Sequence, residues 1–508
     1  MPVLRAVCLL VCLQICVPFP ASASAAAALN PVDIAWLRRD GFDLDAASVT
    51  RLRSMGRAGL LEAQLTDRIP EQLPPAIATL LDSYPALTSS LDKSLIARRQ
   101  EQEKLNAMPD GDDKLAAKKA AQQAANEFGQ QAQEIVLLRA VYGQNQLKEQ
   151  LIDFWLNHFS VYLGKGRVRW MAADYEEHVI RPHALGKFKD LLMATLKSPA
   201  MLEYLDNAQN AKGKVNENYA RELMELHTLG VGAGYTQQDV QQLALILTGS
   251  GLEPLDGNEQ AFAPALAPFV VREGLFEFNP KRHDFSDKVL LGQTIRGSGF
   301  NEVTQAVELI TRQKACAEFI SQRLAEYFVA DKPPHALVER MAATFQRSDG
   351  DIAQVMRTLF QSKELQHSAG SKFKDPIQFV ASSVRLAYDG KSVANARPMI
   401  NWLNQMGEPV FGRVTPDGWP LDSSGWTSSG QLSKRFEIAR IIGRGDSQLF
   451  TPQGSPKAGI GFPMITTRLF YDAVAPGLSA ATRGALDQAA SQQEWNTYLL
   501  SSPDFNNR

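Results

Sequence analysis

The segment from Asn216 to Gly230, with the sequence NENYARELMELHTLG, constrains the fold more than any other stretch of this chain. It places three carboxylates, an arginine, a tyrosine, two asparagines and a histidine in about four turns of predicted helix. A helix that only filled a core would carry fewer groups that need partners when buried. A helix that only faced water would not also carry Tyr219, Leu223 and Met224. The segment therefore predicts polar chemistry that enters the protein interior.

Helical periodicity dominates the chain from residue 135 onward. Leu147, Leu151, Phe154, Trp155 and His158 repeat at helical spacing and predict one buried face. The same pattern predicts helices near 184–197, 217–229, 236–248, 301–330, 334–346, 350–366, 376–388, 431–443 and 478–500. Between residues 251 and 300, the alternating segment 276–278 could pair with 288–292 as a hairpin. The predicted class is mainly α, a large multi-helix domain with a small β-hairpin element.

Composition shifts divide the chain into five predicted parts. These are a signal peptide (1–25), an N-terminal helical segment (26–86), a charged helical hairpin (87–134), a main helical domain with a small β element near 270–295 (135–390), and a Gly/Trp-rich segment with terminal helices (391–508). The hairpin, rich in Lys, Gln, Glu and Ala, is expected to project from the body. It serves either as a solvated arm or as a partner-binding arm.

Bulk composition excludes some classes of function. Of the 508 residues, 44% are hydrophobic and 21% charged, which is typical of a soluble globular protein. The net charge of −2 gives no basis for a nucleic-acid partner held by bulk electrostatics. After the N-terminal segment, no apolar run approaches the ~18–20 residues of a membrane span.

The N-terminus predicts export. Arg5 precedes an apolar stretch from Val7 to Phe19, and small residues at 21–25 offer cleavage sites. We therefore expect a periplasmic or secreted protein. Three of the four cysteines lie in this segment, so the mature chain would keep only Cys316 and form no internal disulfide.

Several long motifs resemble one family. They are RAVYGQNQL (139–147), FWLNHF (154–159), PAMLEYLDN (199–207), the 216–230 segment, YTQQDV (235–240), LTG (247–249), HD (283–284), DGD (349–351) and DGWP (417–420). This set, over roughly residues 30–445, is similar to the exported bacterial family catalogued as domain of unknown function 1800. The resemblance implies export and a largely helical fold, and it implies no settled activity or cofactor.

A metal site is one hypothesis for the polar residues. On a regular helix, His227 lies about 140° from Glu222 and about 160° from Glu225, so one helix cannot offer all three to one ion. His227 instead shares a face with apolar residues, as does His158. A metal site would have to be assembled across elements, from His158, His227 and His283 with Asp284.

Carboxylate acid–base chemistry is the main hypothesis. Glycan cleavage needs two carboxyl groups, one protonated and one ionised. The predicted catalytic residues are Glu222, Glu217, Asp284 and His283. The predicted substrate-binding residues are Trp155, Asn157, His158, Asn207, Asn218, Tyr219 and His227. Alternatively, Glu217, Arg221 and Glu225 form helix ion pairs and Asn216 caps the helix, which is a structural network.

Other chemistries lack their motifs. The chain has no nucleophile elbow, no phosphate-binding loop and no dinucleotide fingerprint, so the cofactor remains unknown. The segment 349–351 is expected to be a turn and N-cap rather than a calcium loop. We therefore expect a hydrolase or lyase acting on an extracellular polymer such as a glycan. The alternatives are an envelope or secretion-linked protein that binds a protein partner through the hairpin, and a metal-dependent enzyme.

Overall fold

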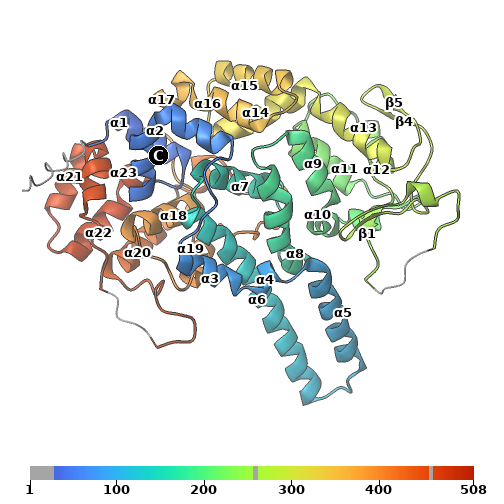
Figure 1. Cartoon of the computed structure of the whole chain (residues 1–508), viewed down its shortest axis with the longest axis horizontal. Helices are drawn as coiled ribbons and strands as arrows, with labels where there is room; N and C mark the ends of the chain where they lie inside the picture. Colours follow the sequence, from blue (N-terminus) through green and yellow to red (C-terminus); the bar gives the residue numbers. More distant parts are fainter. Residues whose placement is uncertain (1–27, 256–260, 457–460) are drawn as a thin grey trace, which may run out of the picture.

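The computed structural model describes residues 28–255, 261–456 and 461–508, and it is mainly helical (Figure 1). The predicted signal peptide and the three cysteines within it lie outside the described residues. Cys316 is buried, and burial raises the pKa of its thiol, as expected for an inert core residue.

The N-terminal part leads into a long arm. The first helices are α1 (Pro31–Asp40), α2 (Ala46–Leu65), α3 (Pro75–Asp82) and α4 (Pro85–Thr88). The next two, α5 (Leu91–Ala107) and α6 (Asp112–Tyr142), run side by side and project from the body (Figure 1). The end of α6 nearest the body is buried, including Ile135, Leu137 and Leu138. The predicted projecting helical hairpin is therefore confirmed.

The central helices surround the segment that the sequence singled out. They are α7 (Gln146–His158), α8 (Val168–Asp174), the π-helix η1 (Tyr175–Ile180), η2 (Arg181–His183), α9 (Phe188–Lys197), α10 (Pro199–Tyr204), η3 (Asn207–Gln209), α11 (Asn218–Glu222), the π-helix η4 (Leu223–Thr228) and α12 (Gln237–Ile246). The five residues predicted to share one face of α7 are all buried.

The small β element differs from the predicted hairpin. One sheet has the order β1 (Ser250–Leu252), β3 (Phe276–Phe278) and β2 (Val271–Glu273), all antiparallel. A second pairs β4 (Lys288–Leu290) with β5 (Gln293–Ile295). The predicted pairing of 276–278 with 288–292 is thus wrong. Each strand has only three residues, too few for the sequence to specify a partner.

The remaining helices complete the body. They are α13 (Phe300–Thr311), α14 (Lys314–Phe328), α15 (His335–Arg347), α16 (Ile352–Phe360), α17 (Lys363–His367), α18 (Pro376–Ala387), α19 (Arg397–Met406), η6 (Ser423–Gly425), α20 (Ser429–Arg444), η7 (Phe470–Val474), η8 (Ala475–Gly477), α21 (Ala480–Asp487), α22 (Gln492–Ser501) and α23 (Pro503–Asn506); the short η5 (Ala267–Phe269) precedes β2. Three segments predicted as single helices, at 301–330, 350–366 and 478–500, are each two helices. Asp351 caps α16, as predicted, by accepting a hydrogen bond from the Gln354 amide at 3.0 Å.

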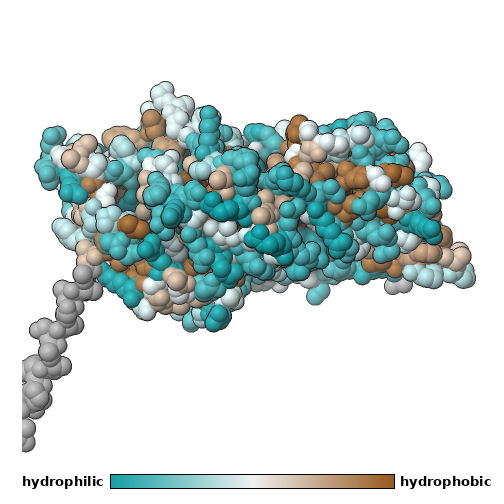
Figure 2. Space-filling view, turned by 90° about the horizontal axis from the view of Figure 1, so that it is seen from above, coloured by the Kyte–Doolittle hydropathy of each residue, from teal (hydrophilic) through white to brown (hydrophobic). Residues whose placement is uncertain are grey.

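One hydrophobic core joins these parts. Its buried residues run from Leu29, just before α1, to Phe505 in α23. The face seen in Figure 2 is largely hydrophilic, with hydrophobic side chains gathered toward the end that carries α13 and the small sheets. Within the described ranges, no helix combines the length and the apolar character that crossing a membrane requires.

Candidate active site

The 216–230 segment changes helical geometry in its middle. It starts as α-helix in α11 and continues as the π-helix η4, a form that occurs often at functional sites. Ala220, Leu223, Met224 and His227 are buried, whereas Glu222 and Glu225 are only partly buried. The expected separation of His227 from the carboxylates is confirmed. The carboxylates therefore remain within reach of solvent while the imidazole enters the core.

The two central histidines are neutral core residues. The His158 Nε2 lies 3.0 Å from the carbonyl oxygen of His227, and the two ring centroids are 6.1 Å apart. Burial lowers the pKa of His158, and it lowers that of His227 to about 3. Both imidazoles therefore stay uncharged near neutral pH.

His283 belongs to a separate, sealed cluster. Its Nδ1 contacts the Thr248 carbonyl at 2.8 Å, and its Nε2 contacts Glu302 Oε1 at 2.9 Å. Lys288 donates to the other oxygen of Glu302 at 2.6 Å, and all three side chains are completely buried. This ring of partners leaves His283 no opening toward a substrate.

Asp284, the neighbour of His283, is tied into its own loop. Its carboxylate accepts hydrogen bonds from the hydroxyl and, at 2.9 Å, from the amide of Ser286. The hydroxyl contact is the main cause of its lowered pKa. Among the described residues, no group of three or more His, Cys, Asp or Glu side chains is placed to hold a metal ion, so His158, His227 and His283 do not form one site.

Four of the predicted substrate-binding residues lie outside the lining of the cleft described below. The Trp155 indole is fully buried and donates to the Ala184 carbonyl at 3.1 Å. Asn207 donates to the Ser250 carbonyl at 3.1 Å. Tyr219 is buried, and Asn218 is exposed at the start of α11. These positions account for four of the predicted residues without a ligand.

A cleft of about 510 Å³ lies beside Glu225, the carboxylate of η4, and we call it the DGWP cleft. It is lined by His158, Glu225, Leu226, Val231, Phe319, Arg323, Glu326, Asp331, Arg413 and residues 417–422. In the sequence, Asp417-Gly418-Trp419-Pro420 stands out only as a family motif, and no local pattern indicates that it forms a wall of the cleft. The Gly-Trp pair within this family motif is the sequence feature that could have indicated a functional loop.

Asn157, a predicted substrate-binding residue, positions that wall. Its Nδ2 donates to the Trp419 carbonyl at 3.0 Å, and its Oδ1 accepts from the Trp419 amide at 2.6 Å. Gly418 has φ = 72°, and a Cβ there would lie 2.3 Å from the Asn157 carbonyl oxygen. Only glycine fits this approach without distortion. Asn157 thus acts on the cleft through the loop backbone.

Glu222 lies three residues before Glu225, which lines the cleft, and it has no bonded partner within the described residues. Among the residues that the structure describes, its carboxylate makes no hydrogen bond and no ion pair. Burial raises its pKa, and the charges of Glu225 and Asp417 add to the effect against an opposing contribution from Arg221. Both Glu225 and Asp417 line the cleft, so charges on the cleft walls help to raise the pKa of Glu222.

Asp417 has the opposite environment. Arg413 donates two hydrogen bonds to its carboxylate, at 3.0 and 2.7 Å, and Thr415 donates a third at 2.6 Å. Burial would raise the pKa of Asp417, but these hydrogen bonds outweigh it and hold the pKa below its usual range. One carboxyl is thus biased toward the protonated form and its neighbour toward the ionised form.

A family model described as "Protein of unknown function (DUF1800)" matches residues 35–507. The chain belongs to the DUF1800 family. Comparison with curated proteins and with solved structures finds no match. The match extends beyond the 30–445 range of the motifs and includes the C-terminal helices, which join the same core.

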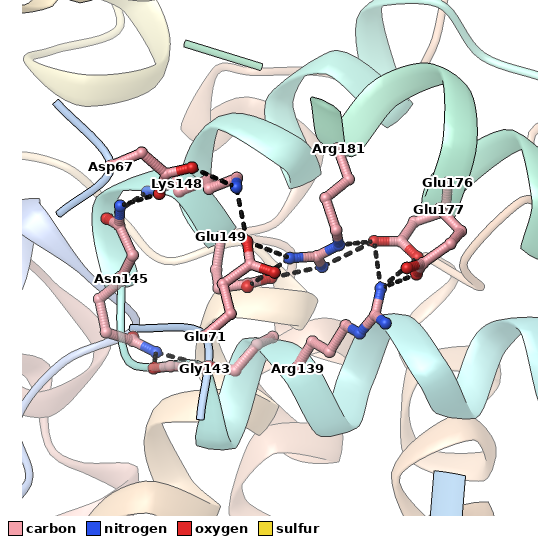
Figure 3. A network of polar contacts seen from close by, with 12 residues as sticks. Asp67, Glu71, Arg139, Gly143, Asn145, Lys148, Glu149, Glu176, Glu177 and Arg181 are labelled. Atoms are coloured by element: carbon pink, nitrogen blue, oxygen red, sulfur yellow. Dashed lines mark hydrogen bonds and ion pairs between the residues drawn. The ribbon is translucent and has the colours of Figure 1, made fainter. Parts of the chain in front are cut away.

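The first DUF1800 motif serves a buried ion network (Figure 3). Arg139, its first residue, donates to Glu176 at 3.0 Å and also contacts Glu177. Arg181 bridges Glu176 and Glu149, at 2.7 and 2.8 Å. Since each charge here has opposite charges bonded to it, this network is structural.

A second hollow of about 700 Å³ in this DUF1800 chain lies between α5, η1, α9 and the first sheet. His178 and His183 line it, together with several carboxylates. His178 is paired with Asp174 at 2.9 Å, and His183 contacts the Val179 carbonyl. No residue predicted as catalytic or substrate-binding borders this hollow. The DGWP cleft is lined by the predicted residue His158 and by Glu225 and Asp417, whose charges act on Glu222, so it is the better candidate for the active site.

Proposed function

We propose that this protein is a hydrolase that cleaves an extracellular polymer, most simply a glycan, by carboxylate acid–base chemistry in the DGWP cleft. Glu222 would donate the proton to the leaving group, and Asp417 would act as the ionised carboxylate. The observation that carries the proposal is that the charge of Asp417 helps to raise the pKa of Glu222, while hydrogen bonds from Arg413 and Thr415 lower the pKa of Asp417 itself. Such a divergence is how one site supplies an acid and a base together.

Each carboxyl group suits one step. A protonated Glu222 can give its proton to the glycosidic oxygen as the bond to the sugar breaks. The ionised Asp417 stabilises the positive charge that develops on the sugar, and water then adds to that carbon and returns a proton to Glu222. This pattern favours hydrolysis over elimination, because a carboxylate with a lowered pKa is a poor base for removing a proton from carbon.

The walls of the cleft offer contacts for a sugar. Trp419 is partly exposed, and the Arg413 guanidinium lies 5.3 Å from its ring centroid. An aromatic face beside hydrogen-bonding groups binds the apolar face and the hydroxyls of a sugar ring. Asn157 supports this surface by fixing the Trp419 backbone. The predicted export signal supports an activity in the periplasm or outside the cell.

The variant Glu222→Gln tests the proposal. Because Glu222 bonds to no described neighbour, the substitution should change the free energy of unfolding by no more than about 0.5 kcal/mol. Release of reducing ends from a panel of envelope and extracellular polysaccharides should fall about 10²- to 10⁴-fold, the usual contribution of a general acid. Glu318→Gln, at an exposed ion pair on α14, is the control. Full turnover by Glu222→Gln would contradict the proposal.

A second candidate function rests on the projecting arm. The hairpin of α5 and α6 extends away from the body, a shape suited to binding a protein partner in the cell envelope (Figure 1). Replacing residues 100–120 by a short Gly/Ser turn should then abolish partner capture while the thermal unfolding of the body is retained. If the truncated protein keeps its partner, the arm is not the binding element.

A further inference from the structure

We propose that the DGWP cleft selects a sugar unit that carries a carboxylate, and that Arg323 binds that carboxylate. The inference rests on the proposed function of the cleft and adds the class of substrate. A polymer of hexuronic acid units is the simplest example.

Arg323 is the cation of the cleft whose hydrogen-bonding capacity is unused. It lies on α14, lines the cleft, and its side chain is 23% exposed. Its nearest acid is Glu326, with 3.6 Å between Nη1 and Oε2, which is beyond hydrogen-bonding distance. Glu326 instead accepts a hydrogen bond from Gln322 at 2.8 Å. Across the described part of the chain, the Arg323 guanidinium donates no hydrogen bond.

The other cations around the cleft are already committed. Arg413 donates both arms of its guanidinium to Asp417. Lys372 donates to Asp331 at 2.6 Å and also contacts the Leu421 carbonyl. Arg323 therefore differs from its neighbours, because no protein acceptor among the described residues is hydrogen-bonded to its planar guanidinium group. Such a group can bind a carboxylate through two parallel hydrogen bonds.

The charges around Arg323 disfavour a dianion more strongly than a monoanion. Glu225, Glu326, Asp331, Asp417 and Asp422 line the same cleft, so a dianionic phosphate would meet strong repulsion. His158 is also in the lining, and because burial keeps it neutral it adds no positive charge. A single carboxylate can satisfy the fork of Arg323 while the rest of the sugar contacts neutral surface such as Phe319 and Trp419.

The closing experiment compares one polymer in two forms. Oligosaccharides of a polyuronic acid and their carboxyl-reduced counterparts differ only in the carboxylate. The wild-type protein should bind the uronate form at least tenfold more tightly by calorimetry, since a charged bidentate hydrogen bond contributes about tenfold or more to affinity. Arg323→Gln should remove this preference. Arg323→Lys, which keeps the charge and loses the fork, should retain only part of it.

Controls separate the possible failures. Arg312→Gln changes an exposed arginine, 68% exposed, and should leave binding unchanged. If Arg323→Gln does not fold, as judged by circular dichroism, Arg323→Lys carries the test alone. Equal binding of the two polymer forms would overturn the inference. So would stronger binding of a sulfated polymer that carries no carboxylate. Turnover of neutral glycans that depends on Glu222 would overturn it too but leave the proposed function intact. Uronate binding that depends on Arg323, without any turnover, would support the inference and remove the proposed function.

Discussion

The buried network around Arg181 and the DGWP cleft use the same side chains in opposite ways. In the network, Arg181 is 7% exposed and bonds to both Glu149 and Glu176. At the cleft, Glu222 is partly exposed and bonds to no partner within the described residues. Both regions are rich in carboxylates, and both come from family motifs or lie next to them.

The difference shows how to separate structural from reactive charge in this fold. Charges that are buried must be paired, because removing an ion from water is costly. Charges kept for chemistry must stay free to change protonation state, so they lie at an opening with unbalanced neighbours. The density of charged residues in a motif therefore does not identify an active site, whereas incomplete compensation at a cleft does.

The largest expected change in stability tests whether the buried network around Arg181 is structural. Arg181→Met leaves Glu149 without its buried partner and should lower the free energy of unfolding by about 3–5 kcal/mol. Urea denaturation followed by circular dichroism measures the change. Arg99→Met is the control, because its pair with Glu103 on the arm is 44% and 60% exposed and should contribute less than about 1 kcal/mol. Equal effects at the two sites would break the distinction.

Asp153 sharpens the comparison because it is partly buried and has no bonded cation among the described residues. Burial, with the nearby charge of Asp375, raises its pKa to about 7. It lies behind residues 419–421, which line both its small pocket and the DGWP cleft. Its folded-state pKa is above the unfolded value near 4. Its stabilising contribution is therefore complete below about pH 4 and is lost as the pH rises through about 7.

Asp153→Asn should remove this pH dependence of the stability. Wild-type stability should decline between about pH 4 and 7 by on the order of 3 kcal/mol more than that of the variant, because Asn cannot ionise. Tyr327, which donates to Asp153 at 2.8 Å, can still donate to the amide oxygen. Thermal unfolding across this pH range measures the difference. Parallel curves for the two proteins would show that Asp153 ionises normally.

Local features of this fold could be predicted from the sequence. The buried face of α7 and the Asp351 cap follow from spacing within one element, and both are present. The arm follows from charged helical patterns joined by a Pro/Gly turn. The periodicity of the segment 301–330 predicts one helix because it continues across the break at Arg312 and Gln313.

The candidate site could be predicted only in part, because its components are distant in the chain. The residues around Glu222 in its own helix predict it as a candidate. Asp417, whose charge acts on Glu222, comes from a distant loop that Asn157 holds in place. The sealing of His283 depends on Glu302 and Lys288, which no local pattern links to it. Pairing between short strands failed for the same reason, since it depends on tertiary contacts.

Gly418→Ala should disturb the cleft more than the body. The positive φ costs roughly 1–2 kcal/mol for a residue with a Cβ, and the contact with the Asn157 carbonyl adds to it. Gly390→Ala is a matched control, with φ = 71° and no atom within 4 Å of the added Cβ. We expect Gly418→Ala to lose turnover and show the larger drop in stability. Equal loss in both variants would mean that Asn157 does not fix the loop.

The smallest effect is expected at Glu217, which shares a helix with Glu222 and was an equal candidate in the sequence. Its carboxylate accepts from Gln237 at 2.7 Å and pairs with Arg221 at 3.4 Å, and the paired side chains are 35% and 38% exposed. Such a pair contributes at most about 1 kcal/mol. Glu217→Gln should therefore leave both stability and turnover nearly unchanged. A loss of turnover as large as that of Glu222→Gln, at unchanged stability, would move the reactive carboxylate away from the DGWP cleft and show that a compensated charge can be the catalytic one.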